Sequence, residues 1–194
     1  MTGWRAFTGR AVVFAHDNVD TDQLIPARFM SAPRAQGYGR FLLHDHPDRD
    51  TLSGAEIVIA GRNFGCGSSR EAAVYALVDA GIRAVIAPGF GDIFAANAVN
   101  NGLLPAVVAD TAALRAAVDA GGEIAIDLEK GTLSAGEITE TFTLDAAARD
   151  KIVNGWDDID LTASHTDTIA TFIKTYHGTY PWSRPNPKGE PTCA

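Results

Sequence analysis

The sequence has few cysteines, a shortage of basic residues and no long apolar run, and each shortage excludes a class of protein. Two cysteines among 194 residues are too few for a disulfide framework. Sixteen Lys and Arg against 24 Asp and Glu give a net charge of −8, and a pI near 5.0 argues against a nucleic-acid partner. No apolar run reaches the ~18–20 residues of a membrane span, and no signal-peptide core follows the start. We therefore expect a cytoplasmic protein that contacts neither nucleic acid nor membrane.

The scarcity of metal ligands is equally informative. An iron–sulfur cluster is usually held by four thiolates, so Cys66 and Cys193 cannot hold one by themselves. His44 and His46 form a pair in a charged loop without a third ligand nearby in sequence, which is more typical of solvated side chains than of a metal site. Three aspartates could bind a cation, but turn formation explains them as well: Asp17, Asp20 and Asp22. We predict no metal site in this chain.

The residues that are abundant predict an α/β protein. Apolar residues make up 46% and mean hydropathy is −0.01, which is typical of a globular chain with one good core. Buried strands are predicted over 55–60, 82–87 and 103–108, a further strand over 8–15, and helices over 68–80, 92–100 and 111–120. Alternation of this kind indicates a parallel sheet with right-handed crossovers.

The pattern changes after Gly121. Short antiparallel strands are predicted over 123–128, 132–134 and 137–144, and helices over 145–154 and 164–176. The fold class is therefore α/β with a parallel strand–helix core and a β-rich addition. We expect one domain over 1–177, followed by a Pro-rich tail over 178–194 that is extended and mobile.

The most informative segment is NFGCGSSRE over 63–71, which joins a predicted strand to a predicted helix. It is not a dinucleotide fingerprint, because Arg70 stands where the third glycine should be and no acid follows the next strand. It is not a nucleophile elbow, because Glu71 stands where the final glycine should be. Cys66 in such a tight turn is more typical of packing than of nucleophilic catalysis.

Two interpretations of this turn stay open at the level of the residues. Ser68 and Glu71 fit a capping box, with Ser68 as the N-cap of the helix. That interpretation does not explain why Arg70 lies in the first turn, where a cation opposes the helix dipole and costs a few tenths of a kcal/mol. A bound anion would offset this cost, and free N–H groups, two hydroxyls and a guanidinium suit a carboxylate.

Four segments taken together resemble a known family. They are 18–29 (NVDTDQLIPARF), 63–73 (NFGCGSSREAA), 82–105 and 154–171, and they occur in the order found in the small subunits of 3-isopropylmalate dehydratase. The resemblance extends from about residue 10 to residue 176. This family corresponds to the swivelling fourth domain of aconitase made as a separate chain. The resemblance therefore implies a three-layer β/β/α swivelling domain, and a large-subunit partner that carries a [4Fe–4S] cluster while this chain binds none.

The resemblance also implies a reaction. Water is eliminated from 2-isopropylmalate and added back one carbon over, which gives 3-isopropylmalate in leucine biosynthesis. Ser68, the first serine of the Gly-Ser-Ser-Arg motif, would be the catalytic base. The residues carried over as substrate-binding are Ser69, Arg70, Thr21, Asp22, Asn97 and, in the loop 30–38 that meets the substrate's side group, Arg34.

The chain departs from the family at two places. Ala72 stands where the motif usually has His, and the stretch between Phe41 and Ala55 is shorter than in many bacterial relatives. Both departures leave the reaction type unchanged but leave the substrate open. The alternatives are a paralogous hydro-lyase acting on another 2-alkylmalate, of the homoaconitase, 2-methylmalate or dimethylmalate type, and a carboxylate-binding domain without catalysis.

Overall fold

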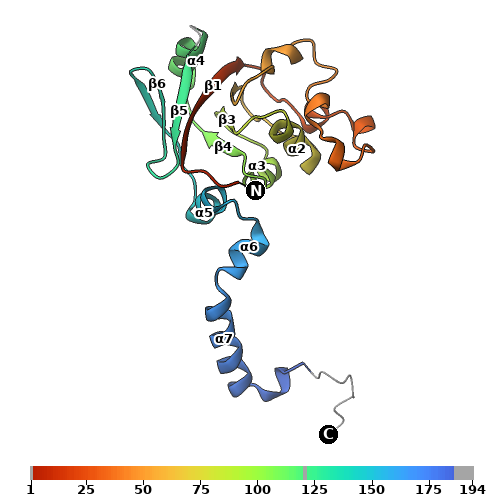
Figure 1. Cartoon of the computed structure of the whole chain (residues 1–194), viewed down its shortest axis with the longest axis vertical. Helices are drawn as coiled ribbons and strands as arrows, with labels where there is room; N and C mark the ends of the chain where they lie inside the picture. Colours follow the sequence, from red (N-terminus) through yellow and green to blue (C-terminus); the bar gives the residue numbers. More distant parts are fainter. Residues whose placement is uncertain (1, 120–121, 186–194) are drawn as a thin grey trace. The chain divides into compact units, whose positions relative to one another are not determined.

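The computed structural model describes residues 2–119 and 122–185 (Figure 1). Its contacts divide the chain into two compact units, Met1–Asp158 and Ile159–Ala194, each of which is described by itself. The division falls after Asp158, whereas the sequence placed the boundary between domain and tail after residue 177. No helix among the described residues is long and apolar enough to cross a membrane.

The first unit is built on one seven-stranded sheet with the order β4-β3-β2-β1-β5-β6-β7. The parallel half contains β1 (Ala6–Phe14), β2 (Ile57–Ala60), β3 (Ala84–Ala87) and β4 (Leu104–Val107). The antiparallel half contains β5 (Glu123–Asp127), β6 (Thr132–Ala135) and β7 (Ile138–Thr141). The predicted parallel core and β-rich addition are both confirmed, and β1 belongs to both because it pairs with β2 and with β5.

The first unit holds five α-helices among its described residues: α1 (Thr21–Leu24), α2 (Glu71–Asp79), α3 (Asp92–Asn100), α4 (Ala112–Asp119) and α5 (Ala146–Asn154). Four short 3-10 turns lie between β1 and β2: η1 (Ala27–Phe29), η2 (Arg34–Gln36), η3 (Gly39–Phe41) and η4 (Arg49–Leu52). The predicted helix over 92–100 has the same bounds as α3. The predicted helix over 68–80 corresponds to α2, which begins three residues later than predicted.

The described residues of the second unit are mostly helical. It comprises α7 (Thr166–Thr179) and the 3-10 turn η5 (Pro181–Ser183), and α6 (Asp158–Ala163) begins at the boundary. The sequence did not predict α6, and it expected residues from 178 onward to be extended. That expectation is wrong for residues 178, 179 and 181–183, because α7 continues through Thr179 and η5 follows it. The remainder of the expected tail, 186–194, lies outside the described residues.

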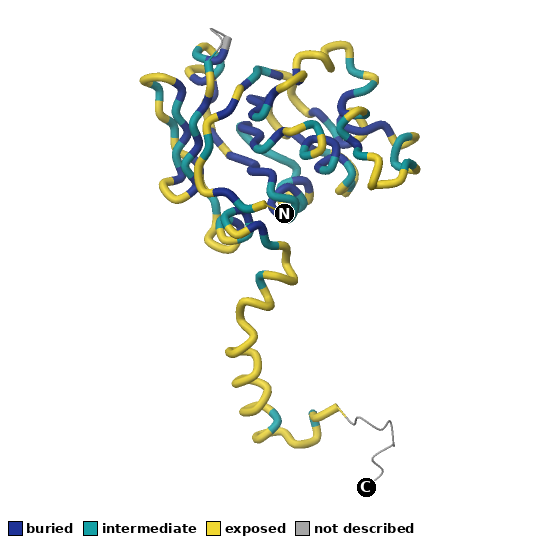
Figure 2. The backbone as a smooth tube through the Cα atoms, in the orientation of Figure 1, coloured by how far each residue is buried: buried dark blue, intermediate teal, exposed yellow. Residues whose placement is uncertain are grey.

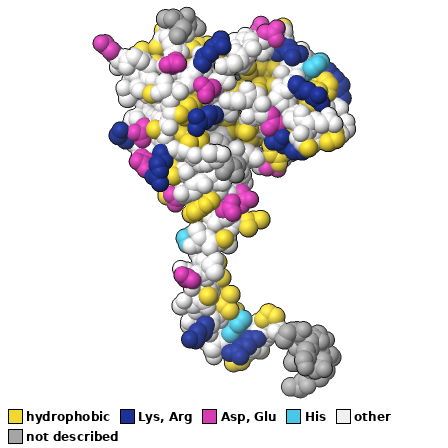
Figure 3. Space-filling view, viewed as in Figure 1, with side chains coloured by type: hydrophobic (Ala, Val, Ile, Leu, Met, Phe, Trp, Pro, Cys, Tyr) yellow, Lys and Arg dark blue, Asp and Glu magenta, His cyan; other side chains and the backbone are white. Residues whose placement is uncertain are grey.

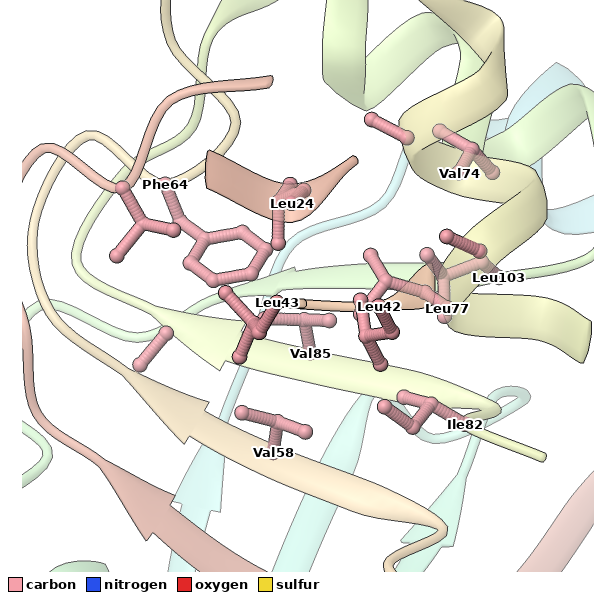
Figure 4. Packing of buried hydrophobic residues seen from close by; sticks show 14 of the residues in the cluster. Leu24, Leu42, Leu43, Val58, Phe64, Val74, Leu77, Ile82, Val85 and Leu103 are labelled. Carbon is pink, nitrogen blue, oxygen red and sulfur yellow. The ribbon is translucent and has the colours of Figure 1, made fainter. Parts of the chain in front are cut away.

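Each face of the parallel sheet half carries its own hydrophobic core. Successive strand residues point to opposite faces, so Val58 packs in one core while Ile57 and Ile59 pack in the other. Figure 4 shows the first core, in which the α2 residue Leu77 lies beside Leu42, and Val58 and Val85 extend from the sheet into the same core. The second core joins the other face of the parallel strands to side chains of α4, α5 and the antiparallel half.

The sheet curls until its two ends meet. An isolated antiparallel bridge joins Val107, in the edge strand β4, to Thr143, just beyond the opposite edge strand β7. Helix α4 contacts β1, β6 and β7, so it lies against the concave side of this curl. The layers are therefore α2 and α3, the parallel half, and the antiparallel half. This is the β/β/α arrangement that the resemblance implies.

Candidate functional site

The candidate site lies at the carboxyl ends of β1, β2 and β3, which are on the same side of the sheet. The Gly65 N–H donates to the carbonyl of Val19 at 2.8 Å, and the Phe64 N–H donates to the carbonyl of Gly89 at 3.1 Å. These backbone bonds join the three loops that follow the three strands. Ligands of open α/β sheets bind beyond the carboxyl ends of the strands, so this edge is a favourable place for a site.

Thr21 and Ser68 are 47 positions apart in sequence and adjacent in space. The Thr21 N–H donates to the carbonyl of Cys66 at 3.0 Å, and its Oγ1 donates to the carbonyl of Ser68 at 3.0 Å. Thr21 is 2% exposed, so both bonds are shielded from water. The start of α1 therefore fixes the backbone of the Gly-Cys-Gly-Ser turn.

A second contact joins the same two segments. The Arg70 guanidinium forms an ion pair with the Asp22 carboxylate, and 22% of the Arg70 side chain is exposed against 53% for Asp22. Ser69 lies between Ser68 and Arg70 and is exposed. Five of the seven residues predicted for the site are thus brought together: Ser68, Ser69, Arg70, Thr21 and Asp22.

The predicted capping box at Ser68 and Glu71 is absent. Helix α2 begins at Glu71, its N-cap is Arg70, and no side chain caps it. The reason is tertiary: Thr21 holds the Ser68 carbonyl, and Gly67 adopts a φ of +90°, so the chain reaches the helix axis only at Arg70. A capping box does exist nearby, at the start of α1, where the Asp20 carboxylate accepts from the Gln23 N–H.

The missing cap changes the chemistry available to Ser68. A capping serine would commit its oxygen to the helix N–H groups. Among residues 2–119 and 122–185, no hydrogen bond to the Ser68 hydroxyl is found, and the side chain is exposed. The first N–H groups of α2 are likewise uncapped by a side chain, which is the arrangement that attracts an anion.

A glycine is required at position 65 because α3 packs closely against it, and not because a ligand needs the space. Its φ is +72°, and a Cβ atom there would lie 2.1 Å from Cγ of Phe94 in α3. The Phe94 ring is 3% exposed and meets the ring of Phe64 edge-on at 5.6 Å. Gly65 therefore allows α3 to approach the turn closely.

Helix α3 carries Asn97, and its C-cap Asn101 is a residue that the sequence did not single out. Asn97 is half-buried, and its carbonyl accepts from Nδ2 of Asn101 at 2.9 Å. Nδ2 of Asn101 also donates to Oε1 of Glu71 at 2.9 Å, which joins the end of α3 to the first residue of α2. In the sequence, Asn101 and the glycine after it indicated only the end of a helix.

Arg34 is not brought to the site. Its guanidinium binds both carboxylate oxygens of Asp79, at 2.6 and 2.9 Å, and lies over the ring of Tyr75 at 4.3 Å. Asp79 is the last residue of α2 and Arg70 its N-cap, so a nine-residue helix, about 13 Å long, separates them. Burial, together with a hydrogen bond to Glu71, raises the pKa of Tyr75.

The two histidines of the charged loop, His44 and His46, contact different partners. Nδ1 of His44 lies 3.0 Å from the Asp45 carboxylate, which Arg28 also binds, and these contacts hold the pKa of Asp45 well below its usual range. His46 instead groups with His16 and Asp48, whose ligand atoms lie within 4.8 Å of one another. Nε2 of His16 is 2.9 Å from the Asp48 carboxylate, and the Asp48 N–H donates to Nδ1 of His46 at 3.1 Å. These hydrogen bonds already account for the cluster.

The three aspartates of 17–22 point to three different partners. Asp17 binds Arg62 at 2.8 Å, which lowers the pKa of the Asp17 carboxyl. Asp20 caps α1, and Asp22 pairs with Arg70. Each carboxylate therefore serves a separate contact. The turn-forming interpretation is confirmed for Asp20, whereas Asp17 and Asp22 pair with arginines 45 and 48 positions away.

Comparison with known proteins shows which class of protein the fold resembles. A family model described as the aconitase C-terminal domain matches residues 44–111, which include the whole Gly-Cys-Gly-Ser turn and α2. The turn and the parallel strands and helix around it are thus similar to the corresponding part of an aconitase C-terminal domain.

Curated relatives narrow the class to a family. A 3-isopropylmalate dehydratase small subunit from Shewanella baltica is 39% identical over 95% of this chain and 100% of the relative. One from Koribacter versatilis is 40% identical over 91% of this chain and 100% of the relative. A crystal structure of 3-isopropylmalate dehydratase from Methanocaldococcus jannaschii is 29% identical, covers 86% of this chain and 98% of that chain, and has a TM-score of 0.66. The chain belongs to the family of 3-isopropylmalate dehydratase small subunits.

Proposed function

We propose that this chain is the catalytic small subunit of a cytoplasmic 3-isopropylmalate dehydratase. With a large subunit it interconverts 2-isopropylmalate and 3-isopropylmalate by dehydration and rehydration in leucine biosynthesis. The observation that carries the proposal is the junction of Thr21 with Ser68 and of Asp22 with Arg70, which leaves the Ser68 hydroxyl uncommitted beside an uncapped helix. The names of the relatives support the same reaction.

The cluster that such a reaction needs does not fit this chain. Cys66 is the one thiol among the described residues, it is partly buried, and its carbonyl is held by Thr21. The second cysteine, Cys193, lies outside the described residues, and two thiolates fall short of the usual four. We therefore assign the [4Fe–4S] cluster to the large subunit, where its open iron would act as a Lewis acid.

Ser68 is the proposed base. A serine hydroxyl is a weak base until its proton is removed, so it needs positive charge nearby. The N-terminus of α2 supplies about half a charge, and Arg70 supplies a full one that Asp22 balances in the free chain. The ionised Ser68 oxygen would take the proton from the carbon next to a substrate carboxylate as the hydroxyl group leaves the adjacent carbon as hydroxide. On rehydration, hydroxide would add one carbon over and Ser68 would return its proton to the other carbon, which regenerates the ionised oxygen.

The carboxylate clamp would come from the same turn. Ser69 and the N–H groups of α2 can donate to a substrate carboxylate, and Arg70 can pair with it. Thr21 and Asp22 would hold Ser68 and Arg70 in place, and Asn97 offers an amide from α3. Arg34 would act on specificity indirectly, by fastening the loop 30–38 to Asp79.

Reconstitution tests the proposal directly. The chain is mixed with the large subunit from the same organism, the cluster is rebuilt anaerobically, and enoate formation from 2-isopropylmalate is followed by absorbance. We expect turnover by the mixture and none by either chain alone. A panel of other 2-alkylmalates decides between the dehydratase and a paralogue. Tight binding of 2-alkylmalates without turnover of any of them would instead favour a carboxylate-binding domain.

A further inference from the structure

The second unit carries an unusual surface. Five large apolar residues recur along one face of α7 and just beyond it, at the spacing i, i+3, i+4, i+7 and i+11: Ile169, Phe172, Ile173, Tyr176 and Tyr180, called here the aromatic stripe. Their exposed fractions run from 39% to 63%, and the adjacent Trp182 is 80% exposed. Figure 2 shows α7 exposed along its length, and Figure 3 shows apolar side chains gathered on it.

The aromatic stripe is ordered along the helix but buries nothing. The rings of Phe172 and Tyr176 stack at 5.5 Å, and Tyr176 meets Tyr180 at 5.0 Å. No residue of α7 is buried. A helix of 14 residues is marginal in water by itself and is normally stabilised by packing of its apolar face. The aromatic stripe is therefore suited to packing against an apolar surface that the described residues of this unit do not supply.

The area of the stripe decides what kind of partner suits it. Aromatic side chains of 150–250 Å² at these exposures, with the two isoleucines and Trp182, present on the order of 500–700 Å² of apolar surface. That matches the upper end of the apolar patches found on monomers, which are often functional. It falls short of the ~800 Å² per partner of a standard interface.

A second copy of this chain is the less favourable occupant. Two stripes paired with each other would bury on the order of 1,000–1,400 Å² in total, at the low end of the range for stable interfaces, and each copy carries a net charge of −8, which opposes association. A larger partner that also contacts the first unit would supply the missing area. The large subunit is such a partner, because it has to reach the Ser68 turn in any case.

We propose that α7 is a docking helix whose aromatic stripe lies in an apolar groove of the large subunit. The inference rests on the proposed function, since that function supplies the partner. The mode is a helix in a groove, with Phe172 and Tyr176 as the buried anchors. The stripe contributes affinity for the large subunit and takes no part in the chemistry at Ser68.

The test compares Phe172→Ala with Thr171→Ala in the full chain. Thr171 lies on the opposite side of α7, and its hydroxyl bonds within the helix to the carbonyl of Asp167 at 2.9 Å. Alanine favours helix, so neither change removes α7. We expect Phe172→Ala to raise the Kd for the large subunit about 30-fold, as a hot-spot residue does, and Thr171→Ala to leave it within about two-fold. At saturating large subunit, kcat should match the wild type in both variants.

The outcomes separate this inference from the proposed function. Equal Kd values for the wild type and Phe172→Ala overturn the docking helix even if turnover is normal. A stripe-dependent complex without turnover supports the docking helix and refutes the proposed reaction. Self-association in sedimentation that Phe172→Ala abolishes would show that a second copy covers the stripe. Hydrogen exchange in the isolated chain that protects α7 as strongly as β2 would show that the chain covers it itself. Either of these two results overturns the proposal.

Discussion

The two units use the same kinds of apolar residue in opposite ways. In Met1–Asp158, side chains such as Phe64, Leu77 and Ile59 are completely buried in the two cores. In Ile159–Ala194, the large apolar side chains among the described residues are exposed, up to 80% at Trp182, except for the half-buried Leu161. The difference indicates which apolar side chains pack within their own unit and which are available to a partner. The first unit assembles its site from its own packing, whereas α7 presents a surface with partners elsewhere.

The largest expected effect tests the chemistry of the first unit. Ser68→Ala removes the proposed base, and we expect kcat of the reconstituted enzyme to fall by about 10²- to 10⁴-fold. The Kd for the large subunit should not change, because the Ser68 hydroxyl bonds to none of the described residues. Steady-state kinetics and calorimetry check the two quantities. A rate near that of the wild type would remove Ser68 as the base.

The next effect tests the packing that positions the turn. Gly65→Ala places a Cβ atom against the Phe94 ring at a left-handed φ, and we expect the free energy of unfolding to fall by about 3 kcal/mol. Gly136→Ala is the matched control, because Gly136 also has a positive φ, +60°, with nothing within 4 Å of the added atom. It should cost about 1 kcal/mol. Urea unfolding measures both, and equal losses would show that the clash with Phe94 is relieved.

A third prediction compares the loss of stability caused by removing an apolar side chain from each unit. Leu77→Ala empties part of the first core, and we expect it to cost about 2–5 kcal/mol in unfolding of the first unit. Phe172→Ala in the isolated chain should change that free energy by less than about 0.5 kcal/mol, since Phe172 is exposed. Urea unfolding followed by near-ultraviolet circular dichroism checks the pair. A large loss from Phe172→Ala would mean that the units stabilise each other.

The smallest expected effect is a pH dependence in the loop before β2. Arg28 and His44 lower the pKa of Asp45, so the folded state favours its ionised form. That stabilisation is present above the unfolded pKa of about 3.9 and is lost as the pH falls below it. Asp45→Asn should therefore flatten the fall in the urea midpoint between pH 4 and pH 2. Asp50→Asn, at a carboxylate that is 97% exposed, serves as the control and should leave the slope unchanged.

The sequence predicts most of the fold because the fold follows local patterns. Short β-branched runs such as 57–60 and 84–87 are strands, and the bounds of the helix at 92–100 are confirmed at both ends. The error at α2 has a different origin. Ser68 followed by Glu71 matches a capping box locally, but the deciding contact comes from Thr21, 47 positions away. Hydropathy patterns also give no sign that the apolar face of α7 is left exposed by the described residues of its own unit.

The candidate site, like the fold, has a part that could be predicted from the sequence and a part that could not. The motif around Ser68 and the Thr21–Asp22 pair could be singled out from the sequence, and the structure joins them. The positions of long charged side chains could not be predicted, because their partners are set by tertiary packing. Arg34 reaches Asp79 rather than the site, and His46 groups with His16 rather than with His44. Asn101 escaped notice for the same reason, since its partner Glu71 lies 30 positions away.

The place of β1 in the sheet has a consequence for synthesis of the chain. β1 emerges from the ribosome before the other described strands. One of its edges pairs with β2, but its other edge stays unpaired until β5, whose first residue is Glu123, has been made. At about 5–20 residues per second, the ~110 residues between these strands take roughly 5–20 s to make. During that time the free edge of β1 is open to pairing with other chains. Slowing translation before β5 should therefore lower the yield of folded protein more than slowing it afterwards.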